Sequence, residues 1–111
     1  MNFEQKKNGQ TTVFTLKERK LDAAIAAELK AEFLLLCKPK GAKRLVLDLT
    51  KVEFCDSSGL SALLIADRAM REHGGAIHLV HVHKKVLDLI KISQLDRVFS
   101  IKKSVADALK N

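Results

Sequence analysis

The sequence of 111 residues has no tryptophan and no tyrosine, and its five phenylalanines are its only large aromatic residues. Proteins that hold single-stranded nucleic acid commonly stack the bases on aromatic side chains set among basic ones, and this chain offers no such platform. Its formal net charge of +7 would by itself permit a nucleic acid or an anionic membrane as partner. Because the basic residues are spread over turns and helix ends, we expect a solvated basic surface, with no direct nucleic-acid partner and no membrane partner.

Cysteine, proline and long apolar runs are also scarce. The two cysteines, Cys37 and Cys55, are too few for a disulfide framework and are predicted to be reduced thiols. A single proline in a chain with 47% hydrophobic residues favours one folded domain over residues 1–111. No apolar stretch approaches the roughly 20 residues that span a bilayer, and the first six residues lack the plan of a signal peptide. These absences predict a cytoplasmic protein.

The stretch from Leu45 to Leu64 carries the strongest patterns. Residues 45–49 form an apolar run interrupted only by Asp48, which predicts a strand covered on both faces, as in a parallel sheet between helices. From Leu60 onward the apolar residues recur at helical intervals, which predicts a helix that starts near Ser58. In open α/β sheets, function collects beyond the carboxyl ends of the strands, and Asp48 and the loop before this helix should lie there.

The residues that open this helix, Asp56, Ser57, Ser58 and Gly59, have two interpretations. Asp56 and Ser57 are both good N-cap residues, whose side-chain oxygens accept from the free amides of the first turn. Gly59 would let another molecule approach the backbone closely, at the positive end of the helix. The residue types alone leave open whether the loop only caps the helix or also has a function.

The other elements are predicted from turn, capping and periodicity signals. Asn8-Gly9 predicts a type I′ turn and hence an N-terminal β-hairpin. Asp22 is predicted to cap a helix that ends near Cys37. Leu34 and Leu35 widen its apolar stripe, which favours a helix half sunk into its neighbours over a second covered surface or a partner contact. Further along, the patterns predict a strand over 76–82, a helix over 85–91, a short strand over 98–101 and a helix capped by Ser104.

Together these patterns resemble the STAS domain, a family named for sulfate transporters and anti-sigma factor antagonists. The core of the resemblance is Leu45-Val46-Leu47-Asp48-Leu49-Thr50, followed by Val52-Glu53-Phe54 and by Asp56-Ser57-Ser58-Gly59-Leu60. Flanking features agree over nearly the whole chain, including a final strand from Leu95 to Ile101, although Gln94 stands where the family often has glycine. The resemblance implies one STAS domain over residues 1–111, of the α/β class, with a mixed, mostly parallel β-sheet, an N-terminal β-hairpin and about four helices.

A freestanding domain of this size resembles the anti-sigma factor antagonists, also called anti-anti-sigma factors. The resemblance implies that the unphosphorylated form binds an anti-sigma factor that is also a serine kinase, and that this releases a sigma factor. Phosphorylation of the second serine of the motif, Ser58, would end the binding, and a PP2C-type phosphatase would restore it. The implied partner surface comprises Asp22, Asp56, Ser57, Ser58 and Gly59. ATP would belong to the kinase, so no cofactor is assigned to this chain.

Catalysis by the chain itself is not indicated, because it has no Gly-x-Ser-x-Gly elbow, no phosphate-cradling glycine loop and no helical metal-binding histidine pair. Two other functions stay open. One is a STAS scaffold subunit that steadies the ATPase of a lipid or solute transporter, and the other is a phosphoryl-accepting receiver that uses Asp48 and Asp56 around a divalent ion. His81 and His83 could share one face of a strand end, but a metal site needs three or four ligands, so no metal is predicted.

The surroundings of Ser58 are predicted in two respects. Asp22 and the turn over 18–20 should lie at the same end of the sheet as Ser58, because a strand that enters a helix there ends beside the loop of the central strand. Gly59 should provide access, because a side chain there would stand between Ser58 and a docked kinase. The helix itself should tolerate or even favour alanine at this position.

Overall fold

A five-stranded sheet with the order β1-β2-β4-β6-β7 forms the centre of the structure, a computed structural model that describes residues 1–110. β1 and β2 pair antiparallel and the other three pairs are parallel, while β3 and β5 form a separate parallel ribbon. The strands are β1 (Phe3–Asn8), β2 (Thr11–Leu16), β3 (Lys20–Leu21), β4 (Arg44–Asp48), β5 (Phe54–Cys55), β6 (Ala76–Val80) and β7 (Ser100–Lys102). The helices are α1 (Ala23–Leu36), α2 (Ser57–Glu72), α3 (Lys84–Ile92), the 3-10 turn η1 (Leu95–Arg97) and α4 (Val105–Leu109).

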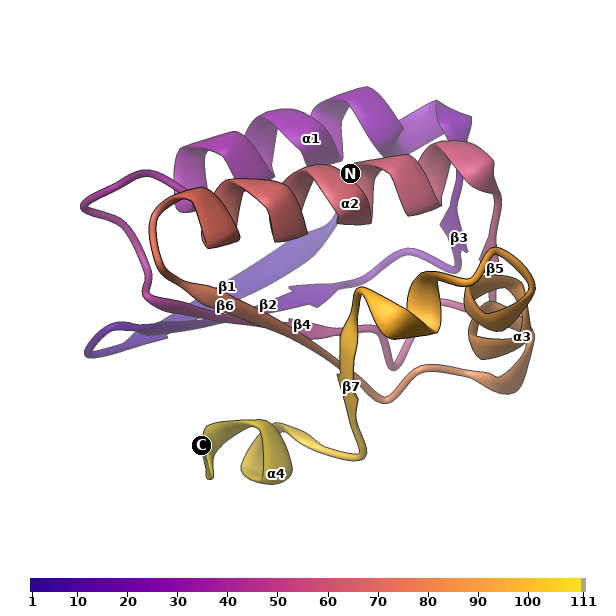
Figure 1. Cartoon of the computed structure of the whole chain (residues 1–111). Coiled ribbons are helices and arrows are strands. Elements are labelled where there is room, and N and C mark those ends of the chain that lie inside the picture. Colours follow the sequence, from indigo (N-terminus) through magenta and orange to yellow (C-terminus); the bar gives the residue numbers. More distant parts are fainter. Residues whose placement is uncertain (111) are drawn as a thin grey trace.

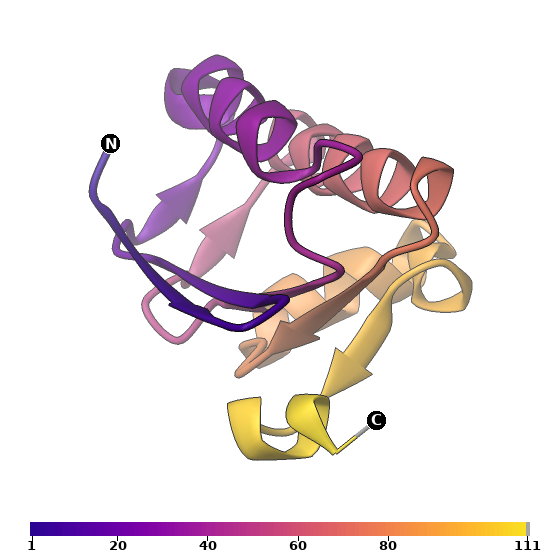
Figure 2. The same ribbon diagram turned by 90° about the vertical axis from the view of Figure 1, so that its left-hand side faces the viewer.

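Helices cover both faces of the sheet (Figures 1 and 2). α1 and α2 lie side by side over one face, where Leu45 and Leu47 of β4 join the main hydrophobic core. α4 covers part of the other face, where Val46 packs with Val80 and Ala108. β4 is therefore buried on both faces, which confirms the prediction from its apolar run. Within residues 1–110, no helix is both long enough and apolar enough to cross a membrane.

The N-terminal hairpin is present, but its turn lies one residue later than predicted. Asn8 pairs with Thr11, so the two loop residues are Gly9 and Gln10. Gly9 has a φ of 61°, whereas Gln10 does not have a positive φ. Glycine at the first loop position, as the only residue with positive φ, is the pattern of a type II′ turn and not of the predicted type I′ turn.

α1 begins where predicted, but its outer surface is less covered than predicted. The side chain of Asp22 caps the helix by accepting a hydrogen bond from the Ala24 amide at 3.1 Å. Phe33 is buried on the inner face, yet Leu34 and Leu35 are 56% and 60% exposed. α1 is half sunk into its neighbours as predicted, but this does not account for Leu34 and Leu35, which lie outside the buried face. α1 packs against α2 on one side, and nothing in residues 1–110 covers the side that carries the two leucines.

The chain after α3 departs from the prediction at one point. Residues 95–97 form the 3-10 turn η1 and not the start of a long final strand, and β7 is only three residues long. Gln94, which stands where the family often has glycine, has φ 59° and ψ 23°. This left-handed conformation costs other residues more than glycine, which accounts for the preference. Ser104 caps α4 as predicted, by accepting from the Asp107 amide at 3.2 Å.

Candidate functional site

The predicted serine motif forms the first turn of α2. Asp56 is the N-cap residue, and its carboxylate accepts a hydrogen bond from the Gly59 amide at 3.0 Å. Ser57 and Ser58 therefore occupy the first two helical positions; Ser57 is exposed and Ser58 is half-buried. Of the two predicted cap residues, only Asp56 acts as the cap. Within residues 1–110 neither serine hydroxyl makes a hydrogen bond, and both lie at the positive end of a 16-residue helix.

The β3–β5 ribbon holds the start of α1 against the start of α2. In this ribbon Leu21 is the register partner of Cys55, and the Asp56 amide donates to the carbonyl oxygen of Leu21 at 3.2 Å. The N-caps of the two helices thus follow directly from two paired strands, so Asp22 and Asp56 lie at the same end of the fold. Figure 1 shows β3 and β5 together at this end. The predicted location of Asp22 beside the serine motif is confirmed. Two-residue strands have no measurable periodicity, so the sequence did not reveal the ribbon.

Gly59 is buried against the ribbon and does not face the solvent beside Ser58. A Cβ atom at this position would lie 2.2 Å from the carbonyl oxygen of Leu21, 2.7 Å from its Cγ and 2.9 Å from the Cys55 sulfur. These distances are far shorter than ordinary contacts, and the closest atom belongs to the backbone. The predictions that Gly59 provides access for a kinase and that α2 would tolerate alanine are therefore wrong. Gly59 is needed because α2 and β3 approach closely here.

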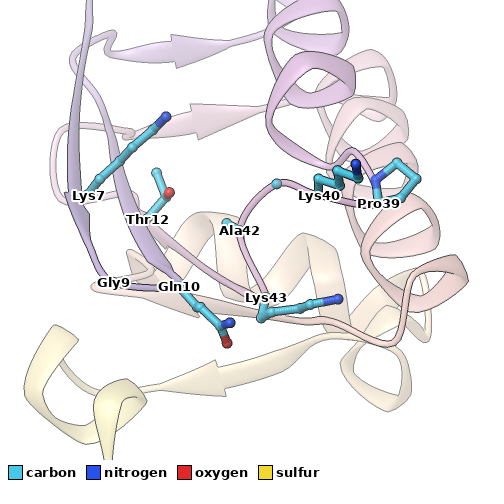
Figure 3. A pocket seen from close by; sticks show the side chains of 9 residues that line it. Lys7, Gly9, Gln10, Thr12, Pro39, Lys40, Ala42 and Lys43 are labelled. Atoms are coloured by element: carbon cyan, nitrogen blue, oxygen red, sulfur yellow. The ribbon is translucent and has the colours of Figure 1, made fainter.

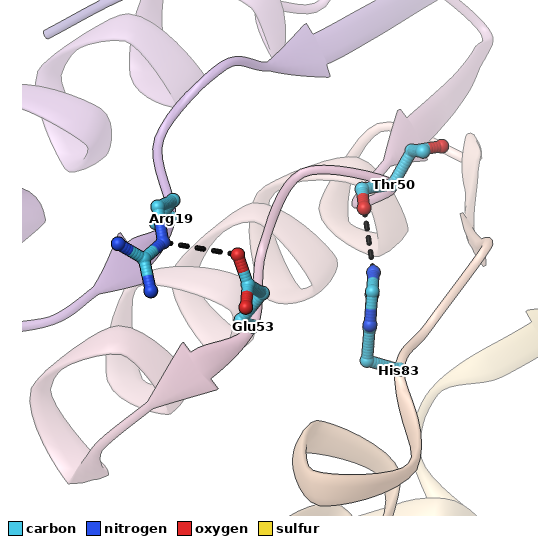
Figure 4. A network of polar contacts seen from close by, with 4 residues as sticks. All are labelled: Arg19, Thr50, Glu53 and His83. Atoms are coloured by element: carbon cyan, nitrogen blue, oxygen red, sulfur yellow. Dashed lines mark hydrogen bonds and ion pairs between the residues drawn. The ribbon is translucent and has the colours of Figure 1, made fainter.

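Two polar contacts fix the loop between β4 and β5 (Figure 4). Arg19 Nε donates to Glu53 Oε2 at 3.0 Å, and His83 Nε2 donates to the carbonyl oxygen of Thr50 at 2.6 Å. Because a carbonyl oxygen can only accept, His83 carries a hydrogen on Nε2 in this arrangement. The Arg19–Glu53 pair is exposed, so it orients the turn before β3 more than it stabilises the fold. Both contacts join residues more than 30 positions apart, and no local sequence signal marks them.

The acidic and thiol groups near the site serve the fold. Asp48 accepts from the Thr50 amide at 3.0 Å and from the Thr50 hydroxyl, so its carboxylate closes the turn after β4. Burial raises the pKa of Cys55 to about 12, with a further contribution from the negative charge of Asp56, and burial alone raises the pKa of Cys37 to about 11. Both cysteines are free and buried, and neither is an activated nucleophile. The described residues contain no cluster of three or more potential metal-ligating side chains.

Comparison with known proteins gives a consistent result. The STAS domain family matches residues 2–108. A protein of Bordetella bronchiseptica with the provisional name anti-sigma factor antagonist BtrV is 30% identical over 84 residues, which cover 76% of this chain and 72% of that protein. The crystal structure of a Thermotoga maritima protein, also provisionally described as an anti-sigma factor antagonist, superimposes with a TM-score of 0.86 at 25% identity, covering 97% of this chain and 92% of the other. The phosphorylated form of SpoIIAA from Bacillus shares the fold, with a TM-score of 0.75 at 17% identity and coverage of 97% and 96%.

Proposed function

Because the chain belongs to the STAS domain family and is homologous to anti-sigma factor antagonists, we propose that it acts as one of them through a phosphorylation switch. In this proposal the unphosphorylated protein binds an anti-sigma factor that is also a serine kinase, and a sigma factor is released. The kinase then phosphorylates Ser58, which ends the binding, and a PP2C-type phosphatase restores the first state. Anti-sigma factor antagonists are not enzymes, so ATP belongs to the kinase. The cycle would run in the cytoplasm.

The observation that carries the proposal is the position of Ser58 within a combined surface. The β3–β5 ribbon joins the capped start of α1 to the capped start of α2, so Asp22, Asp56 and both serines belong to one end of the fold. A partner that covers this end would contact Ser58 directly. Gly59 is buried beneath this surface and supports it without being part of it.

The first turn of α2 can accommodate a phosphate without unfolding. Phosphorylation would add about −1.5 to −2 charges and three acceptor oxygens to Ser58. Within residues 1–110 the Gly59 amide is bonded to Asp56, but the amides of Ser57 and Ser58 have no hydrogen-bond acceptor. Free amides at a helix N-terminus bind anions favourably. The folded state therefore tolerates the modified serine, and the effect of the phosphate falls on the partner.

The bound partner would respond in the opposite way. A surface that fits a neutral hydroxyl beside Asp56 must, after phosphorylation, desolvate a dianion next to an existing carboxylate. Every 1.4 kcal/mol or so of this penalty weakens the affinity tenfold. A penalty of a few kcal/mol is therefore enough to release the partner while the STAS domain stays folded.

Substitutions at the two serines test this switch. Ser58→Ala should keep partner binding and abolish phosphorylation, whereas Ser58→Asp should weaken binding by tenfold or more with little loss of folding stability. Ser57→Ala is the matched control for phosphorylation and should still take up phosphate on Ser58. The partner is first captured from a lysate of the source cells, and each variant is then titrated against it with and without ATP. Phosphate found on Ser57, or normal affinity of the Ser58→Asp variant, would contradict the assignment.

The identity of the captured protein tests the partner independently of the phosphorylated residue. An ATPase with serine kinase activity toward Ser58 supports the antagonist function. Capture of the ATPase of a transporter, without phosphate transfer to either serine, would instead favour the scaffold function. Incubation of the phosphorylated protein with a purified PP2C-type phosphatase completes the test, since recovery of partner binding should follow the loss of phosphate from Ser58.

A further inference from the structure

The C-terminal helix α4 is attached to the sheet by few contacts. It is five residues long, and Figures 1 and 2 show it on the face of the sheet opposite to α1 and α2. It contacts β4, β6 and β7. Ala108 is fully buried there against Val46 and Val80, with Val105 packed beside them, whereas Leu109 is 43% exposed. A helix this short is not stable alone, so its order depends on these contacts.

One hydrogen bond fixes the end of α4. Arg44 Nη1 donates to the carbonyl oxygen of Leu109 at 3.2 Å, which ties the last residue of the helix to the first residue of β4. Arg44 is held in place because the Gln10 carbonyl oxygen accepts from the amides of Lys43 and Arg44, at 2.8 and 3.1 Å. Figure 3 shows Gln10 and Lys43 side by side at this point. Within residues 1–110 α4 thus has a single hydrogen bond to the sheet, and that bond is exposed.

His78 lies beneath this helix. Its neighbours in β6, Ile77 and Leu79, belong to the main core, so the alternation of the strand directs His78 to the face that carries α4. Its register partners are Val46 on β4 and Ser100 on β7, and its Nδ1 lies 2.7 Å from the Ser100 hydroxyl oxygen. Because α4 spans these three strands, it shields His78 from water, and His78 is only 8% exposed.

The charged groups around His78 offer no partner to an imidazolium. Five such groups belong to the strands and the helix packed against it: Arg44 and Asp48 of β4, Lys102 of β7, Asp107 of α4 and Lys110 at its end. Asp48 closes the turn after β4, and Asp107 pairs with Lys110 at 3.5 Å. Burial lowers the pKa of His78, and the charges of Arg44 and Lys102 lower it further.

We propose that protonation of His78 releases α4 from the sheet, so that the C-terminal helix is an acid-sensitive cover of this face. A charged imidazole beneath α4 would be deprived of water and would have no carboxylate in its place. Undocking of α4 lets water reach the ring at the cost of one small apolar cluster. The main core and the serine motif lie on the other face, so the release is local and does not depend on the proposed phosphorylation switch.

The pH range of the release follows from linkage between protonation and docking. Arg44 and Lys102 repel the charge whether α4 is docked or not, so only the effect of burial on the pKa of His78 is coupled to α4. Docking should be undiminished above the ordinary pKa of about 6.5 and be lost as the pH falls through the lowered pKa. Each unit by which the pKa differs between the two states changes the docking equilibrium tenfold.

Nuclear magnetic resonance of the full-length protein from pH 8 to pH 5 tests the coupling. The Cα and Cβ shifts of residues 105–109 report whether α4 is helical, and the ring-proton shifts of His78 report its protonation. We expect the helical shifts to be lost with the same midpoint as the His78 titration, while the shifts of α1 and α2 stay native. In the His78→Gln variant α4 should keep one state over the whole range. His83→Gln removes an exposed histidine and is the matched control, which should behave as wild type.

Each of the other outcomes would overturn the proposal. α4 is not controlled by His78 if it stays helical after the ring has been protonated, or if His78→Gln loses the helical shifts at the wild-type midpoint. The same holds if His83→Gln abolishes the pH dependence, or if the shifts of α1 and α2 disappear together with those of α4. Circular dichroism shows whether each variant is folded. Should His78→Gln not fold, the agreement of the two midpoints in the wild-type protein decides the test.

Discussion

Replacing Gly59 by alanine should destabilise the protein, although alanine is the better helix former. The added methyl group would lie 2.2 Å from the Leu21 carbonyl oxygen, so α2 and the ribbon would have to move apart by about 1 Å. Such overpacking typically costs about 1–3 kcal/mol. Loss of the hydrogen bond from the Asp56 amide to the same oxygen would add about 0.5–1.5 kcal/mol. The higher helix propensity of alanine offsets at most about 1 kcal/mol of this loss of stability. We therefore expect a net loss of about 1–3 kcal/mol.

Urea unfolding measures this loss directly. The chain has no tryptophan and no tyrosine, so the transition is monitored by circular dichroism and not by intrinsic fluorescence. With a slope of about 1–3 kcal/mol per molar urea, the midpoint should fall by roughly 1 M. Because the closest atom belongs to the backbone, shortening the Leu21 side chain should not rescue the variant. A Gly59→Ala protein as stable as wild type, or more stable, would show that the close approach of α2 and β3 is not real.

Two further predictions concern stability. Asp56→Ala should lower the free energy of unfolding by about 1 kcal/mol because the Gly59 amide loses its cap, whereas Ser57→Ala should change it by less than about 0.5 kcal/mol. Urea unfolding compares the two variants, and a serine variant less stable than the aspartate variant would contradict this prediction. His78 is buried, and its Nδ1 lies 2.7 Å from the Ser100 hydroxyl. Burial lowers the pKa of His78, and the charges of Arg44 and Lys102 lower it further. The contribution of His78 to the free energy of unfolding should therefore be complete above about pH 6.5 and be lost as the pH falls through the lowered pKa. Urea midpoints measured from pH 8 to pH 5 should therefore fall on the acidic side, and the difference between wild type and His78→Gln should narrow there; an unchanged difference would refute this.

The sequence predicted those parts of the fold that local chemistry determines. Asp22, Asp56 and Ser104 each have a short polar side chain directly before a run with helical spacing, and all three cap helices in the structure. The run from residue 45 to 49 predicted a strand covered on both faces because its apolar residues do not alternate. The serine motif was therefore placed at the right end of the sheet and at the right position in its helix.

The predictions failed where contacts between distant residues decide the structure. Gly59 looks like an exposed glycine beside a serine, and only the position of Leu21 shows why a side chain is excluded. Leu34 and Leu35 have the spacing of core residues, but nothing in the described part of the chain packs against that side of α1.

The outer strand β1 has a consequence for behaviour at high concentration. Among residues 1–110, β1 pairs only with β2, so the backbone groups along its other side are available to a strand from another molecule. After Phe3, however, the strand consists entirely of polar or charged residues, and all of them are exposed. A sheet that continued across this edge would have to remove the charged side chains of Glu4, Lys6 and Lys7 from water, which opposes edge-to-edge association. At the other edge β7 has only three residues, too few to template an added strand. The protein should therefore resist aggregation into continuous sheets without needing a partner to cover either edge.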